Sequence, residues 1–497
     1  MHTHFFCPLI WLLITATRCL AADAPPKDIL AGSKPQFCLA ADRDPEWRDH
    51  LPRSLSGRTQ FRARWTFTAP DKLACASLTL QASVSVELCL LNGTPAPPPI
   101  KGLRYATLPG ISPKLLKAGE NRLEIEFGVN GKATDAKGPK PPAVALVSLL
   151  DDDVDFQTEP VLGHAGPDFF TVACRTNMPG EVVLEVDGRQ SRSPRGIIHA
   201  FRATGLKPGT AQSYTLAAYA GSSGGKKIGP FQVSTLPADG GDLSFIALGD
   251  SRSHPNDWAR VAAAVLRKKP MLTVFSGDMV YDGREDRLWD AEFFGMAKPY
   301  FATIPGFYVM GNHETGSPIV GTLLPVPGRD RWKAVAGSAL FIGIDGSLSW
   351  KADSDNLKWL EETLKASREK FIFISSHYPP WSSGPHGVLP EHGSTEARKF
   401  ILPLMKKYGA TVFLGGHEHC YERSETREGI TVIVSGGAGA PLYGKSYIPG
   451  QNPYSKVFAK EHHFCLFNIV GDCCLMKVVT PESKLLDAKE WKARAIK

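Results

Sequence analysis

The C-terminal half of this 497-residue chain alternates between short apolar runs and longer stretches with helical spacing. Short apolar runs are typical of buried strands, and strands that alternate with helices predict sheets covered by helices. We therefore expect an α/β sandwich of βαβ units, with two sheets flanked by helices. The predicted strands are 243–248, 271–276, 307–310, 339–345 and 371–376, with others near 411, 431 and 464, and the predicted helices lie near 257–269, 285–298, 353–366 and 395–407. After residue 471 we expect one more strand and a short polar helix.

Five polar segments that follow apolar runs contain metal-binding side chains. The segments LGDS, GDMVY, GNHE, SSHYPP and GGHEH contain Asp250, Asp278, Tyr281, Asn312, His377, His417 and His419. In an open α/β sheet, side chains beyond the carboxyl ends of the strands meet at one edge. A single Gly-Asp pair more often marks a turn, but seven such side chains in five segments predict a site for two metal ions.

The order of these segments resembles that of the calcineurin-like metallophosphoesterases, and Tyr281, placed three residues after Asp278, resembles the purple acid phosphatases in particular. The resemblance extends over about 243–469. It implies a ferric ion, Fe(III), held by Asp250, Asp278, Tyr281 and His419. It also implies a divalent ion (Zn, Mn or Fe) held by Asp278, Asn312, His377 and His417, with Asp278 as the bridging ligand.

The chemistry of the side chains agrees with two unlike ions. Two adjacent ions can hold the attacking and the leaving oxygens of a displacement, which requires one shared anionic ligand. The phenolate of Tyr281 and the carboxylates favour the more highly charged ion, whereas imidazole suits zinc, iron and manganese. The two ions carry more positive charge than their anionic ligands neutralise. This surplus attracts a phosphate dianion and lowers the pKa of bound water, so we expect a metal-bound hydroxide as the nucleophile.

Three further residues are candidates for contact with the substrate. The position of His313, directly after Asn312, is that of a residue that helps the leaving group depart in the resembling family, and we assign it as the general acid. Arg252 stands where many relatives have glycine, and both a phosphate-binding and a solvent-facing role are open. His386 belongs to the loop 379–393, which resembles the substrate loop of the family in position.

These residues predict an exported phosphatase that hydrolyses phosphate monoesters, with a small phosphorylated molecule as substrate. Phosphodiesterase or nucleotide pyrophosphatase activity on the same ions is an alternative, because loops that the sequence does not resolve select the substrate. A non-catalytic surface or glycan-binding protein is an alternative of another class, and the intact ligand set argues against it.

The composition of the chain limits the classes of partner that we expect it to bind. The net charge of +7 is spread along the chain, without a Lys/Arg tract, a basic helix with interleaved aromatics or an RNA-binding motif, so we expect no nucleic-acid partner. Residues 1–22 resemble a signal peptide, which predicts a secreted or periplasmic protein, and a retained N-terminal anchor is the alternative. No later stretch approaches the ~20 apolar residues of a membrane span.

Two predicted β units precede the catalytic region at 241–497. Residues 23–150 form a β-sandwich candidate that resembles the galactose-binding-like jelly rolls, and Asn92-Gly93 predicts a hairpin within it. A glycan-binding module and a spacer domain are both open for this unit. Residues 151–238 resemble a fibronectin type III domain, because a GLKPGT turn precedes a strand with a tyrosine. The eight cysteines after the leader leave the disulfide pairing open.

Overall fold

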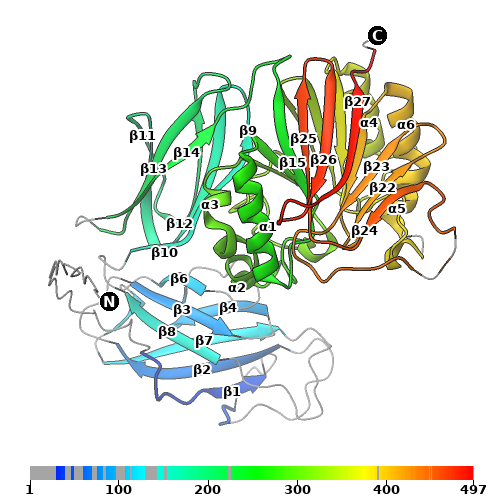
Figure 1. Ribbon diagram of the computed structural model, residues 1–497. Coiled ribbons are helices and arrows are strands. Elements are labelled where there is room, and N and C mark those ends of the chain that lie inside the picture. Colours follow the sequence, from blue (N-terminus) through cyan, green and yellow to red (C-terminus); the bar gives the residue numbers. More distant parts are fainter. Residues whose placement is uncertain are drawn as a thin grey trace, which may run out of the picture.

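The computed structural model describes most of the chain beyond the predicted leader, which lies outside the described residues (Figure 1). The described residues are 29–39, 46–49, 60–69, 75–81, 85–96, 107–111, 115–117, 119–128, 143–149, 154–221, 225–388, 391–446, 448 and 450–495. The chain forms three regions: an N-terminal β region, a middle β region and a C-terminal region of sheets and helices, and the N-terminal region lies below the other two in Figure 1.

The C-terminal region contains two mixed sheets. The first sheet has the order β17-β16-β15-β25-β26-β27, and the second has the order β18-β19-β20-β21-β23-β22-β24. Strands β15, β16 and β17 are parallel to one another, and so are β19, β20, β21 and β23. The strands of the first sheet are β15 (Leu243–Leu248), β16 (Leu272–Phe275), β17 (Gly306–Tyr308), β25 (Phe464–Val470), β26 (Cys473–Val479) and β27 (Leu485–Lys492). Those of the second are β18 (Arg331–Ala336), β19 (Ala339–Ile344), β20 (Phe371–Ser375), β21 (Val412–Gly415), β22 (Tyr421–Glu425), β23 (Thr431–Ser435) and β24 (Ser455–Ala459).

The two sheets pack face to face through aromatic side chains. The ring of Phe245 on β15 lies 4.9 Å from the rings of both Phe341 on β19 and Phe373 on β20. Strands buried on both faces read as nearly continuous apolar runs, which is why LSFIAL and FIFIS signalled their positions in the sequence. This pair of packed sheets, with the helices that connect their strands, confirms the predicted α/β core.

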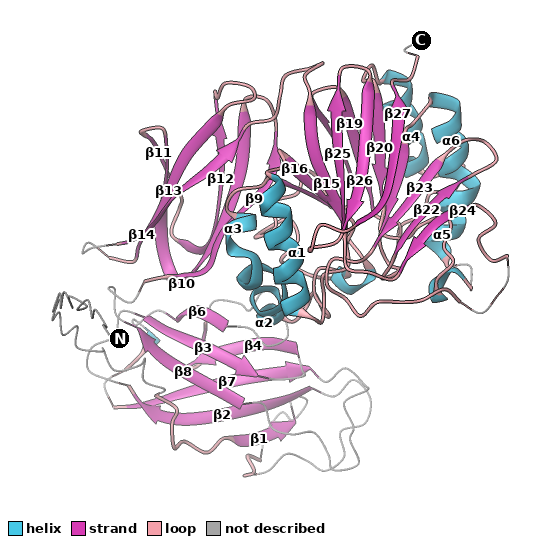
Figure 2. Cartoon of the chain, viewed as in Figure 1, coloured by secondary structure: helices cyan, strands magenta, loops and turns pink. Residues whose placement is uncertain are grey.

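Helices cover the outer faces of both sheets (Figure 2). In α1 the buried residues Trp258, Val261 and Val265 recur at helical spacing and face the first sheet. Ser354 caps α4 by accepting a hydrogen bond from the backbone N–H of Leu357. Beside the first sheet lie α1 (Pro255–Lys268), α2 (Asp286–Leu288), η3 (Trp289–Phe294), η4 (Gly295–Ala297) and α3 (Lys298–Phe301). The others are η5 (Asn312–Glu314), α4 (Asp355–Ala366), η6 (Pro385–Gly387), α5 (His392–Glu396), η7 (Ala397–Ile401) and α6 (Leu402–Tyr408).

The N-terminal β region has two antiparallel sheets, with the orders β1-β2-β7-β4-β5 and β6-β3-β8. Asn92 and Gly93 have positive φ angles of 52° and 79° in the turn between β4 and β5, so the hairpin predicted at this pair is confirmed. The strands are β1 (Gln36–Leu39), β2 (Gln60–Thr68), β3 (Cys75–Gln81), β4 (Ser85–Leu91), β5 (Thr94–Pro95), β6 (Thr107–Ile111), β7 (Glu120–Gly128) and β8 (Ala143–Leu149). A jelly-roll identity for this region stays a prediction.

The middle β region is organised by the long strand β10 (Phe169–Val186). The first part of β10 pairs with β9 (Phe156–Ala165) and β12 (Gly196–Thr204), and its second part pairs with β11 (Arg189–Arg192) and β13 (Ala211–Tyr219). Strand β14 (Lys226–Ser234) completes the sheet beside β13. The fibronectin type III identity and the boundaries 151–238 stay predictions.

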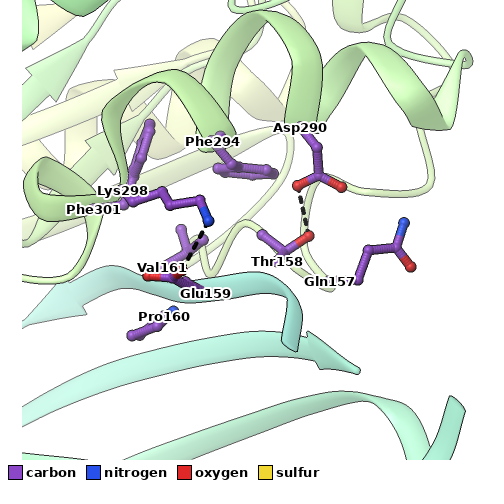
Figure 3. Close-up of a pocket in the computed structure, with 10 residues that line it drawn as sticks. Gln157, Thr158, Glu159, Pro160, Val161, Asp290, Phe294, Lys298 and Phe301 are labelled. Atoms are coloured by element: carbon purple, nitrogen blue, oxygen red, sulfur yellow. Dashed lines mark hydrogen bonds and ion pairs between the residues drawn. The ribbon is translucent and has the colours of Figure 1, made fainter. Parts of the chain in front are cut away.

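Polar contacts join the middle β region to the C-terminal region. The buried guanidinium of Arg175 on β10 forms ion pairs with Asp286 and Asp290, and the Thr158 hydroxyl donates to Asp290 at 2.7 Å. Figure 3 shows the adjacent crevice, where Lys298 donates to Glu159 at 2.8 Å. The cavity there has a volume of about 10 Å³, which is room for about one water molecule.

Two predictions about the elements are wrong in detail. The tail after Cys473 forms strands β26 and β27 instead of a strand and a short polar helix, because β27 pairs along the edge of the first sheet and places the Trp491 ring 6.1 Å from the Phe467 ring. The single helix predicted near 285–298 is divided into α2, η3 and η4, which precede α3. Among the described residues, no helix combines the length and the apolar character needed to cross a membrane.

Candidate metal site

The five predicted segments lie at the carboxyl ends of strands from both sheets. Asp250, Asp278 and Asn312 follow β15, β16 and β17 of the first sheet. The second sheet contributes His377 after β20, and His417 and His419 after β21. Residues that are remote along the sequence therefore meet at one edge of the sandwich.

Strained backbone conformations aim these side chains inward. Asp250, Asp278 and His417 have positive φ angles of 61°, 55° and 70°. Such conformations cost about 1–3 kcal/mol each for residues other than glycine, and they cluster at functional sites. The motif glycines provide room, since a Cβ on Gly311 would lie 2.1 Å from Oδ1 of Asp278, and one on Gly416 would lie 2.5 Å from Oδ2 of Asp250.

The first ligand set contains Asp278, Asn312, His377 and His417. Nε2 of His377 lies 3.0 Å from Oδ1 of Asn312, 3.1 Å from Nδ1 of His417 and 3.3 Å from Oδ1 of Asp278. Nδ1 of His377 donates a hydrogen bond to the carbonyl of Ser276. The lone pair of Nε2 is therefore free to face the ligand atoms of the other three residues. Burial, together with the neighbouring His417, lowers the pKa of His377 to about 4, so this imidazole is neutral and able to bind a metal ion.

The second ligand set contains Asp250, Asp278 and His419. One ligand atom from each lies within 4.8 Å of the others. Nδ1 of His419 donates to the carbonyl of Pro441 at 2.7 Å, which again leaves Nε2 to face the carboxylates. Burial and the nearby Asp278 carboxylate raise the pKa of Asp250 well above its usual range. A cation between two buried carboxylates this close together would stabilise both of them in the charged form.

The structure places Tyr281 outside both sets. Its backbone N–H donates to Glu292 at 2.8 Å, but its side chain is 59% exposed. The described contacts of its ring are with His313, at 5.6 Å between ring centroids, and with the guanidinium carbon of Arg252, at 6.0 Å from the Tyr281 centroid. Its role as a ferric ligand stays a proposal.

Arg252 lies directly against the second ligand set. Its Nε is 3.2 Å from Oδ2 of Asp278, and its Nη2 is 3.4 Å from Nε2 of His419. Burial and the positive charge of Arg252 lower the pKa of His419 to about 3. The Tyr443 ring stacks on the His419 ring, with the two ring centroids 4.1 Å apart. Arg252 therefore belongs to the site and does not point into solvent.

The carbonyl of Tyr281 orients His313, the predicted general acid. Its Nδ1 donates to the carbonyl of Tyr281, and its Nε2 lies 3.7 Å from Oδ2 of Asp278. The backbone N–H of His313 donates to Oδ1 of Asp278 at 3.3 Å. Because Nδ1 is used by the backbone, Nε2 is the nitrogen that faces the pocket.

The loop after β20 brings His386 to the site. The His386 ring lies 4.2 Å from the His417 ring, and its Nδ1 lies 3.1 Å from Oε1 of Glu391. The hydrogen bond to Glu391, which outweighs burial, raises the pKa of His386. Oε2 of Glu391 lies 2.8 Å from Nε2 of His417, out of line with that nitrogen's hydrogen-bonding direction.

Two glutamates in this site were not predicted. Glu391 joins His386 and His417, and no feature of the sequence could place it there, because the contact depends on how its loop folds. Glu314, the last letter of GNHE, accepts hydrogen bonds of 2.9 Å from the backbone N–H groups of Gly311, Asp278 and Met279. Burial, with the Asp278 charge, raises the pKa of Glu314 to about 8. Glu314 thus fixes the two turns that carry Asp278 and Asn312.

The donor sets fit metal ions. The first set offers a carboxylate, an amide oxygen and two imidazoles, which suit zinc, manganese or iron. The second offers two carboxylates and one imidazole, and Asp278 belongs to both, as a dinuclear centre requires.

Comparison with known proteins supports this assignment. Residues 243–421 match the sequence profile described as calcineurin-like phosphoesterase. These residues are a calcineurin-like phosphoesterase domain. The ligand sets lie within this domain, and its relatives include purple acid phosphatases, so the resemblance seen in the motifs is confirmed.

The similar sequences have modest identity to this chain. Tartrate-resistant acid phosphatase type 5 of Homo sapiens is 36% identical over 81 residues, which cover 16% of this chain and 23% of that protein. Purple acid phosphatase 4 of Arabidopsis thaliana is 22% identical over 305 residues, which cover 52% of this chain and 88% of that protein. The chain thus spans about a quarter of the length of the first curated relatives that it matches.

A solved structure extends the likeness in fold. Purple acid phosphatase PPD1 from yellow lupin seeds (Lupinus luteus) is 15% identical, with a TM-score of 0.61 over 89% of this chain and 95% of that one. The structure of PhoD is 13% identical, with a TM-score of 0.52 over 68% of this chain and 91% of that one. The phosphoesterase domain therefore has the fold of a metallophosphoesterase, and this fold family implies a dinuclear metal centre.

Proposed function

We propose that this protein is a metal-dependent phosphatase that hydrolyses phosphate monoesters at the two ligand sets sharing Asp278. The observation that carries the proposal is the convergence of Asp250, Asp278, Asn312, His377, His417 and His419 at one edge of the sandwich, where all of them except Asn312 are buried. In this proposal Fe(III) and a divalent ion occupy the two sets. The ions supply Lewis-acid activation of the phosphoryl group and lower the pKa of bound water.

The protein's own residues position the ester. His313 presents Nε2 toward the pocket while its Nδ1 is held by the Tyr281 carbonyl, and this orientation suits a proton donor to the leaving oxygen. His386 stands on the opposite side, beside His417, and is held by Glu391. Its raised pKa favours the imidazolium, which attracts a phosphate dianion.

A substrate panel tests this function. The chain loaded with iron and zinc should hydrolyse p-nitrophenyl phosphate, and it should hydrolyse bis(p-nitrophenyl) phosphate far more slowly. A preference for the bis-ester would replace the monoesterase proposal with a phosphodiesterase. No turnover of either ester with any metal would leave the non-catalytic alternative. The name of one relative with 22% identity, probable inactive purple acid phosphatase 1 of Arabidopsis thaliana, is the reason to include this alternative in the test.

Visible absorption tests the ferric assignment. If the Tyr281 phenolate binds Fe(III), the iron-loaded protein is coloured by charge transfer from tyrosinate to the ion. Tyr281→Phe should then abolish the visible band and lower the iron content. Unchanged colour and iron content would exclude Tyr281 as a ligand.

We also propose that residues 1–22 are removed during export and that the mature protein is secreted or periplasmic. Sequencing of the N-terminus of the protein recovered from its native host tests this. A mature chain that begins near residue 22 or 23 agrees with export, and a chain that retains Met1 contradicts it.

A further inference from the structure

Arg252 occupies a position that bears on how the two ligand sets take up metal. Its side chain is only 13% exposed, and its Nε and Nη2 lie at hydrogen-bonding distance from Oδ2 of Asp278 and Nε2 of His419. Both of these atoms belong to the second ligand set. A metal ion bound there requires the lone pairs that the guanidinium now faces.

The guanidinium cannot relieve this conflict by losing its charge. Arginine stays protonated in proteins, so its positive charge is present at every pH at which the fold exists. A metal ion at Asp250, Asp278 and His419 would therefore meet both a competing donor and a like charge at close range. Arg252 has to move before the second set can bind a metal ion fully.

The first ligand set has no such competitor. Among the described residues, no arginine or lysine is hydrogen-bonded or ion-paired to Asn312, His377 or His417. Only the shared Asp278 is contacted by Arg252, and through Oδ2, whereas His377 approaches Oδ1. The two sets therefore differ in access although they share a ligand.

A bound phosphate ester gives the guanidinium another partner, since guanidinium pairs bidentately with a phosphate dianion. The Tyr281 ring lies 6.0 Å from the Arg252 guanidinium carbon while Arg252 contacts Asp278, so this cation–π contact already exists before any movement. Phosphate is therefore the partner that stabilises a state in which Arg252 has left Asp278.

We propose that Arg252 is a built-in competitor for the second metal ion, so that the Asp278–Asn312–His377–His417 set fills first and the Asp250–Asp278–His419 set fills weakly until phosphate draws the guanidinium away. This inference rests on the proposed function for the identity of the site, but it concerns metal affinity and not turnover.

Calorimetric titration with Mn²⁺ tests the proposal on the full metal-free chain. Mn²⁺ suits carboxylate and imidazole ligands and avoids the thiols that zinc would find. The wild type should bind two ions, the second at least about tenfold more weakly than the first. Arg252→Met, which keeps the length and removes the charge, should tighten the second step at least about tenfold and leave the first unchanged. Inorganic phosphate should tighten the second step in the wild type and have a smaller effect in the variant.

Controls separate the outcomes. Arg260→Met on α1 removes a half-exposed arginine away from the ligands and should leave both steps unchanged. Circular dichroism confirms that each variant is folded. Equal second-step affinities in the wild type and Arg252→Met, or a parallel change in both steps, would overturn the inference. If the wild type then hydrolyses p-nitrophenyl phosphate, the proposed function stands without the inference. If the titrations behave as expected and no ester is hydrolysed, the inference stands without the proposed function.

Discussion

Asp278 is the side chain shared by both ligand sets. It is 1% exposed, and its two oxygens face different partners, Oδ1 toward His377 and Oδ2 toward Arg252. Burial opposes its charge, but the surrounding His377, His313 and Arg252 outweigh this and lower the pKa of Asp278. A carboxylate that stays ionised at this position can bridge two cations.

Asp278→Asn should therefore empty the site. The amide keeps the shape but loses the bridging charge, so metal content measured by mass spectrometry should fall below two ions per chain. Phosphatase turnover should fall by more than about 100-fold, since even the outer partners of metal ligands contribute ~10–100-fold. Asp257→Asn on α1 is the matched control. Full metal content in Asp278→Asn would refute a bridging role.

His313→Gln should produce a loss that depends on the leaving group. General acid catalysis contributes about 10²–10⁴-fold, and it matters most when the departing alkoxide is basic. We expect a much larger loss of kcat with phenyl phosphate than with p-nitrophenyl phosphate. His254→Gln, at the half-exposed start of α1, should leave both rates unchanged. Equal losses on the two esters would show that His313 binds substrate without donating a proton.

The segment from α2 through η3 connects the middle β region to the metal site. Asp286 and Asp290 on this segment form ion pairs with Arg175 of β10. Two residues further on, Glu292 accepts hydrogen bonds from the backbone N–H groups of Ser253 and Tyr281. The orientation of the Tyr281 turn is thereby tied to an ion-pair cluster at the domain contact.

Arg175→Met should destabilise the chain by about 3–5 kcal/mol, because it leaves the buried carboxylate of Asp286 and the partly buried carboxylate of Asp290 without their cation. The triple variant with Asp286→Asn and Asp290→Asn should recover part of this loss, as measured by urea unfolding. Arg192→Met, which breaks an exposed pair with Glu181, should cost less than about 1 kcal/mol. A similar small cost for Arg175→Met would mean that water screens the cluster.

Some elements of the fold can be predicted from the sequence and others cannot. Continuous apolar runs predict the central strands well, because burial on both faces leaves a local signal. The break of the 285–298 helix into pieces has no local signal, since it follows from how Phe293 stacks on Trp258 while Trp289 and Phe294 pack against Phe293. In the site, motif order predicts which side chains meet, but the outward Tyr281 ring and the inward Arg252 depend on their mutual packing.

Over the chain as a whole, buried neutral histidines make stability depend on acidity. Outside the ligand sets, burial lowers the pKa of His164, His199 and His463 to about 4. His199 is 1% exposed and lies 2.7 Å from the Ser193 hydroxyl and 3.2 Å from that of Thr176. In the unfolded chain a histidine has a pKa of about 6.5, so the unfolded state binds more protons between these values.

The thermal midpoint should therefore fall as the pH is lowered from about 6.5 toward about 4 and level off below that. His199→Gln removes one of the contributing groups, so the difference between its midpoints at pH 7 and pH 4.5 should be smaller than in the wild type. His254→Gln, with a half-exposed ring, should keep the slope of the wild type. An unchanged slope in His199→Gln would mean that His199 accepts a proton without unfolding.

The antiparallel pairing of β15 with β25 has a consequence for synthesis. Leu243 pairs with Ile469, so the strand that leads to Asp250 acquires one of its two neighbours only after residues 464–470 have left the ribosome. The β regions encoded earlier can fold while translation continues. The ion-binding edge, in contrast, matures only after β25 has emerged, and a product that stops before residue 464 would have a half-built first sheet.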